Sequence, residues 1–128
     1  MIRMNDFLDD DLWSLFEASA SGDLAAVKRL VGARPDLVQA QYNYTPAIHF
    51  AVREGRLAVA QYLIDRGAET VDYRSYPFQD SLLTIAEDRE DYEMADLLRK
   101  VAARRFPVAP GLAAFLDVFL PTVAKGVI

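Results

Sequence analysis

Residues 44–68 read YTPAIHFAVREGRLAVAQYLIDRGA and contain two short helical patterns separated by a glycine. Thr45 and Pro46 open the unit, because threonine can cap a helix and proline fits the first helical turn. Gly55 interrupts the pattern, and Gly67 suits the left-handed position after a helix end. Helices this short are unstable alone in water, so the pair must bury its apolar stripes against similar elements.

The same unit recurs on both sides of this stretch. Gly22 precedes Gly55 by 33 residues, and the segments around the two glycines align. Ala86 follows Ala51 by 35 residues within a more divergent copy downstream. A period of this length is typical of a solenoid of stacked helix pairs.

The middle copy resembles the ankyrin repeat. Its segment Thr45-Pro46-Ala47-Ile48-His49-Phe50-Ala51 is similar to the T-P-L-H-x-A signature, with one extra residue after the proline. The flanking copies depart from the signature, as expected of end repeats, and the third has Glu90 in place of the glycine. The resemblance implies an all-α ankyrin-repeat solenoid of stacked helix-turn-helix pairs with projecting finger loops.

We expect one domain over residues 1–128, with repeats at about 11–43, 44–78 and 79–106. Residues 39–44 and 69–80 are predicted to form the two fingers. Asp10 or Asp11 is the predicted N-cap of the first helix, and Asp23 that of the second.

A further apolar helix is predicted at about residues 110–120, with Leu112, Phe115, Leu116 and Phe119 on one face. It resembles the first helix of a fourth repeat, so we expect it to cap the C-terminal end of the stack. The alternative is that Phe115 and Phe119 pair with a second chain, which would make the protein a structural, self-associating subunit.

Composition excludes several function classes. The 128 residues include no cysteine, so disulfide, zinc-thiolate and thiol-nucleophile chemistry is absent. No apolar run approaches the roughly 20 residues of a membrane span, and the first residues lack a signal-peptide layout, so we expect a cytoplasmic protein. The net charge of -5 opposes binding to nucleic acid.

No motif indicates catalysis. His49 is the only histidine, and the resemblance implies that its imidazole hydrogen-bonds to the backbone and ties a finger to a helix. The carboxylate-rich stretch 88–93 lacks the spacing of a calcium loop. We therefore expect no catalytic residue, no metal site, no cofactor and no enzymatic activity.

Aromatic residues in the fingers suggest a binding surface, because tyrosine is enriched at protein interfaces. We expect Tyr42, Tyr73 and Tyr76 to be exposed, and Tyr44 and Phe78 to be buried as staples near helix starts. The ankyrin resemblance implies a partner in a concave groove between the fingers and the first helices. The groove residues at matching positions include Arg53, Glu54, Asp88 and Arg89.

Together these features predict a non-enzymatic interaction module that binds a protein or peptide partner. We expect it to be a monomer or a weak homodimer.

Overall fold

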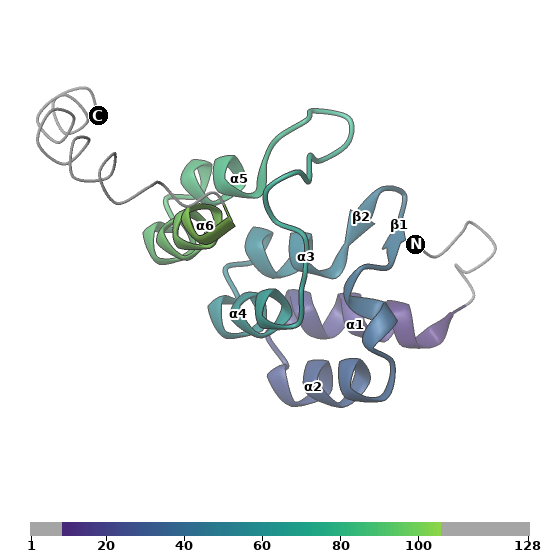
Figure 1. The fold of residues 1–128 in the computed structure, drawn as a ribbon. Helices are drawn as coiled ribbons and strands as arrows, with labels where there is room; N and C mark the ends of the chain where they lie inside the picture. The colour runs from purple at the N-terminus through teal and green to yellow at the C-terminus, as the bar shows by residue number, and fades with distance from the viewer. Residues whose placement is uncertain (1–8, 106–128) are drawn as a thin grey trace, which may run out of the picture.

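The computed structural model describes residues 9–105, which form three helix pairs stacked side by side (Figure 1). The helices are α1 (Asp10–Ser21), α2 (Leu24–Ala33), α3 (Ala47–Arg53), α4 (Leu57–Asp65), α5 (Leu82–Asp88) and α6 (Tyr92–Arg105). The first helices of the pairs, α1, α3 and α5, contact one another in that order, and α2, α4 and α6 form a second row. This arrangement confirms the predicted solenoid of helix-turn-helix pairs.

Small residues at equivalent positions let the helices pack closely. Ala18, Ala51 and Ala86 recur at the predicted intervals, and all three are buried. The largest fully buried side chains are apolar: Leu12, Leu15, Leu37, Ile48, Leu63, Leu82 and Met94. Each helix pair thus buries its row of apolar side chains against the neighbouring pairs, because helices of this length are unstable alone.

The turn inside each pair contains a residue with positive φ at the position where the glycine recurs, and Gly67, predicted to be left-handed, has φ of 96°. Gly22 and Gly55 have φ of 82° and 72°, and Glu90, which replaces the glycine in the third repeat, has 57°. A side chain at Gly22 would also crowd the next repeat, since its Cβ would lie 2.9 Å from Arg56 Cδ. Arg56 Nε donates a 2.8 Å hydrogen bond to the Ala20 carbonyl there and so links the first two repeats.

The first finger is a short hairpin. After a 3₁₀ turn (η2, Pro35–Val38), β1 (Gln41–Tyr42) pairs antiparallel with β2 (Thr45–Pro46). Asn43 and Tyr44 connect the strands with φ of 52° and 65°, as in a type I′ turn. The predicted capping role of Thr45 is wrong: Thr45 lies in β2, Pro46 occupies the N-cap position of α3, and no side chain caps that helix.

The second finger (residues 69–80) contains no helix or strand and is organised by hydrogen bonds. The Glu69 carboxylate accepts bonds from the backbone N–H groups of Val71 and Asp72. Ser75 N–H donates to the Asp80 carbonyl at 2.8 Å, and Asp80 N–H donates to Ser75 Oγ at 3.0 Å. These bonds close a compact loop whose tip is residues 76–78.

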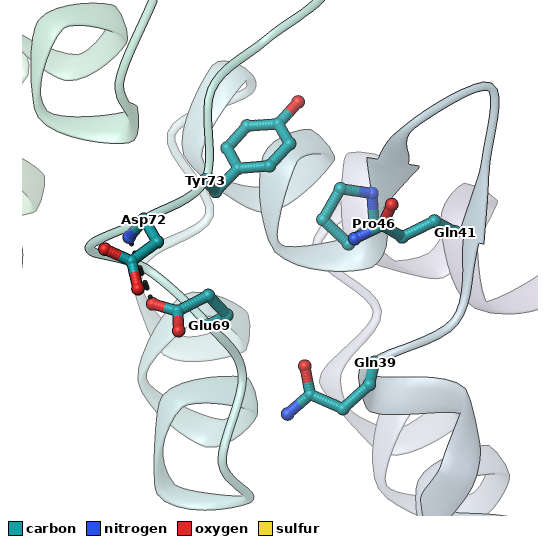
Figure 2. A pocket seen from close by; sticks show the side chains of 6 residues that line it. All are labelled: Gln39, Gln41, Pro46, Glu69, Asp72 and Tyr73. Atoms are coloured by element: carbon teal, nitrogen blue, oxygen red, sulfur yellow. Dashed lines mark hydrogen bonds between the residues drawn. The ribbon is translucent and has the colours of Figure 1, made fainter. Parts of the chain in front are cut away.

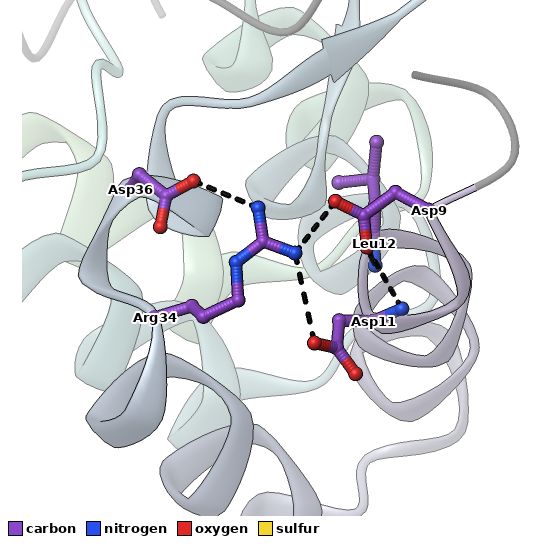
Figure 3. A network of polar contacts seen from close by, with 5 residues as sticks. All are labelled: Asp9, Asp11, Leu12, Arg34 and Asp36. Carbon is purple, nitrogen blue, oxygen red and sulfur yellow. Dashed lines mark hydrogen bonds and ion pairs between the residues drawn. The ribbon is translucent and has the colours of Figure 1, made fainter.

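The first helix is capped one residue earlier than predicted. Asp9, and not Asp10 or Asp11, is the N-cap: its carboxylate accepts bonds from the N–H groups of Asp11 and Leu12. Arg34 donates to the same carboxylate at 2.6 Å and also pairs with Asp36 (Figure 3). Asp9 is thus the N-cap that Arg34, 25 residues away in the sequence, also binds. The predicted cap of α2 is confirmed, since Asp23 accepts from Ala26 N–H.

The predicted C-terminal helix, residues 110–120, lies outside the described residues. Whether it caps the stack or pairs with another chain stays a prediction, and so do Phe115 and Phe119 as interface residues.

Candidate interaction site

The tips of the two fingers carry three exposed aromatic side chains. Tyr44, Tyr76 and Phe78 are 66%, 67% and 81% exposed, and the rings of Tyr44 and Tyr76 lie 5.5 Å apart, centroid to centroid. The expectation that Tyr44 and Phe78 are buried staples is therefore wrong, whereas Tyr76 is exposed as predicted. The physical reason is the turn geometry: Tyr44 sits at a hairpin tip with positive φ, and Phe78 lies in the loop closed by Ser75 and Asp80. We call Tyr44, Tyr76 and Phe78 the fingertip cluster.

Tyr73 is buried, contrary to prediction. Only 8% of the residue is exposed, and its hydroxyl hydrogen-bonds with Nδ1 of His49 on α3 at 3.0 Å. Burial raises the pKa of the Tyr73 phenol, and a hydrogen bond with the Thr45 side chain opposes that shift. Tyr73 therefore belongs to the base of the second finger and is unavailable as a contact at its tip.

His49 ties the second finger to α3, as the resemblance implied. The partner differs from the predicted one: His49 Nδ1 hydrogen-bonds with the Tyr73 hydroxyl and not with a backbone group. Burial lowers the pKa of His49, and the positive charge of Arg53 adds to the effect. The imidazole is therefore kept neutral, in a structural contact.

Aromatic rings connect the first finger to α1 and α3. Trp13 on α1 packs edge-on against Tyr42 of the hairpin at 5.1 Å between centroids. Phe16 packs against Phe50 at 4.9 Å, and the Arg53 guanidinium lies 5.0 Å from the Phe50 ring centroid. Trp13 is 39% exposed, and Tyr42 and Phe50 are half-buried. Tyr42 is thus less accessible than predicted, because Trp13 covers one side of it.

The charged residues predicted for the groove lie at the ends of α3 and α5. Arg53 Nε donates to the neighbouring Glu54 carboxylate at 2.8 Å. That bond lowers the pKa of Glu54, with smaller contributions from the charges of Arg89 and Arg56. Arg53, Glu54 and Arg89 therefore form one mixed-charge group, and Asp88 is exposed beside Arg89 at the end of α5.

A hollow of about 180 Å³ separates the bases of the two fingers (Figure 2). Its walls are Gln39, Gln41, Pro46, Glu69, Asp72 and Tyr73. Gln39 also donates its side-chain amide to the Gly67 carbonyl across this gap. The lining offers carboxylates and amides without a nucleophile and base in contact, so it does not form a recognisable catalytic arrangement. Within residues 9–105, no three His, Asp or Glu side chains gather closely enough to hold a metal ion.

Comparison with known proteins agrees with the helix pairs and their spacing. The family profile of ankyrin repeats matches residues 15–104 in three copies. This chain belongs to the ankyrin-repeat family. Ankyrin repeats are in general protein-interaction modules rather than catalysts.

One curated relative is the "Probable E3 ubiquitin-protein ligase XBOS31" of Oryza sativa subsp. japonica. It is 36% identical over 80 residues, which are 61% of this chain and 18% of the rice protein. The chain thus spans less than a fifth of the length of that relative. In the part of the ankyrin stack that the structure describes, no helix is both long and apolar enough to cross a membrane.

Four aromatic residues of this ankyrin site were missed as candidate contacts from sequence: Tyr44, Phe78, Phe50 and Trp13. Tyr44 had a usable signal: Asn43-Tyr44 is a two-residue connection between extended pairs, where both positions need positive φ and the side chain points away from the core. For Phe50 and Trp13 the indication of exposure in the sequence was weaker. Each lies on a first helix, but helical periodicity does not tell which face of that helix the fingers leave open.

Proposed function

We propose that this protein captures a protein or peptide partner through the fingertip cluster and the adjoining face of α1 and α3. The observation that carries the proposal is Tyr44. A bulky residue at positive φ is unfavourable by about 1–2 kcal/mol, and glycine is the usual occupant of such a turn position. Backbone strain of this kind concentrates at functional sites.

The rest of the surface supports the same proposal. The Tyr44–Tyr76 contact holds the two fingers at a defined spacing, and exposed aromatic rings bind partners with little loss of side-chain entropy. Tyr42, Arg53, Glu54, Asp88 and Arg89 would add a polar rim to this aromatic centre. The net charge of -5 favours a protein partner over nucleic acid.

The rice relative does not extend this proposal to ubiquitin transfer. Because the aligned part is a small fraction of that protein, we propose that the shared property is the interaction scaffold alone.

The proposal is tested by Tyr44→Gly combined with Tyr76→Ser. Glycine suits the left-handed turn and offsets the lost ring contact, so we expect the free energy of unfolding to stay within about 1 kcal/mol of wild type. Partner capture from a cell extract, quantified by mass spectrometry, should be lost. Tyr92→Ser is the matched control, since Tyr92 is equally exposed at 69% but lies on α6. Equal capture by the wild type and the double variant would refute the proposal.

A further inference from the structure

A groove runs along α6 in the row of second helices, away from the fingertip cluster. Two adjoining hollows of about 330 and 410 Å³ lie between α4 and α6, and both are lined by Gln61, Leu97 and Lys100. They join into one groove that follows the length of α6.

Side-chain size explains why this groove is open. Between α2 and α4, Lys28 Nζ lies 5.9 Å from the centroid of the Tyr62 ring, so two long side chains meet at that junction. One repeat later, at intervals of 33 and 35 residues, the equivalent residues are Gln61 and Leu97. Neither is as large as its counterpart, so the space between α4 and α6 stays unfilled.

The groove has opposite charges at its two ends. Glu93 and Asp96 line one end, and Lys100 and Arg104 line the other. Asp96 has a local partner, Arg99 at 3.1 Å, whereas Glu93, Lys100 and Arg104 form no ion pair with another described residue. Glu93 and Arg104 are 11 positions apart on α6, or about 16 Å at 1.5 Å per residue.

We propose that the occupant of this groove is α6 of a second copy of this chain, packed antiparallel. In a two-fold interface, if residue i faces residue j of the partner, residue j also faces residue i. An antiparallel arrangement sets Glu93 opposite the partner's Arg104 and Asp96 close to the partner's Lys100, with Leu97 near the axis. Because the two helices run in opposite directions, the acidic end of each α6 lies against the basic end of the other.

The surface predicts a weak dimer. A single short helix face buries less area than a stable interface, and the overall charge of -5 on each copy opposes association. The contact is independent of the fingertip cluster, which stays open for a partner. It also differs from self-association through Phe115 and Phe119, which would be apolar and insensitive to charge reversal.

The test is analytical ultracentrifugation of the full chain from low micromolar to millimolar concentration. We expect a concentration-dependent dimer at about 0.15 M salt, weakened at about 0.5 M, because screening reduces the attraction between exposed charges. Glu93→Lys/Asp96→Lys and Lys100→Glu/Arg104→Glu should each raise the dissociation constant at least about tenfold. An equimolar mixture of the two variants should form a heterodimer, because positions 93, 96, 100 and 104 are then all basic in one copy and all acidic in the other.

Glu17→Lys/Asp88→Lys is the control, since it changes net charge as the first variant does but on other helices, and it should leave the dimer intact. Thermal unfolding confirms that each variant is folded. A monomer at every concentration, or a dimer that survives both reversals, would overturn the proposal.

Discussion

The hydrogen bond between Tyr73 and His49 joins residues 24 positions apart and fixes the base of the second finger on α3. Tyr73→Phe removes the hydroxyl and leaves Nδ1 of the half-buried His49 without this partner. We expect the free energy of unfolding to fall by about 1 kcal/mol, measured by urea denaturation. Tyr76→Phe should have no effect, because Tyr76 is exposed. Equal stability of the Tyr73 and Tyr76 variants would argue against this contact.

The lowered pKa of His49 makes stability depend on pH. Because the folded protein binds the proton more weakly than the unfolded chain, the free energy of unfolding falls as pH drops below about 6.5, the ordinary histidine pKa. The fall ends once the pH is below the folded-state pKa. We expect urea denaturation to show lower stability at about pH 5.5 than at about pH 7.5, with a smaller difference in His49→Gln.

The two carboxylates whose pKa is lowered, Asp9 and Glu54, do not account for the loss of stability between about pH 7.5 and about pH 5.5. The pKa of Asp9 is lowered because its hydrogen bonds from Arg34 and the backbone outweigh burial, and that of Glu54 is lowered by its bond from Arg53. Both groups therefore titrate at more acidic pH. An unchanged pH dependence in His49→Gln would contradict the assignment to His49.

Among the secondary-structure elements, α1 depends most visibly on its cap. Asp9 satisfies two backbone N–H groups of the helix and also binds Arg34 from the end of α2, so it joins both helices of the first repeat. Asp9→Ala should lower the free energy of unfolding by about 1 kcal/mol, measured by urea denaturation at neutral pH. Asp10→Ala is the matched control, since Asp10 lies in the first turn without capping it. A loss no greater than that of Asp10→Ala would show that the cap is unimportant.

The hairpin shows the limit of local sequence signals. Its strands are only two residues each. Residues 39–45 predict a hairpin less strongly than the Thr45-Pro46 pair predicts the start of α3. Its turn type decides that Tyr44 points outward, and the position of Trp13 decides that Tyr42 is partly covered.

For the molecule as a whole, the described helices leave apolar side chains partly exposed on the C-terminal face of the stack. Leu83 on α5 is half-buried, whereas its equivalent in the middle repeat, Ile48, is fully buried between neighbouring helices. A hollow of about 200 Å³ beside it is also lined by Val71, Leu98 and Ala102. We propose that residues 112–120 cover this face, as a capping helix would.

Removing the residues after Arg105 tests that proposal. We expect a lower thermal midpoint and lower solubility, because apolar surface on the third repeat loses its cover. Phe115→Asp/Phe119→Asp in the full chain separates the two roles: lost stability in a monomer indicates a cap, and lost dimerisation with intact stability indicates an interface. If truncation changes neither quantity, residues 112–120 do not cap the stack.

The sequence by itself determined the repeat, its period, the helix pairs and the turn positions. These follow from local rules: helical periodicity, glycine at positive φ and aspartate at a helix start depend on residues a few positions apart. Only the tertiary structure decided which finger aromatics are exposed and which helix pair leaves a groove. Tyr73 hydrogen-bonds with a histidine 24 residues away, and the groove on α6 is lined by Gln61 and Leu97, which come from different repeats. Such outcomes depend on side chains that meet only after the repeats have stacked.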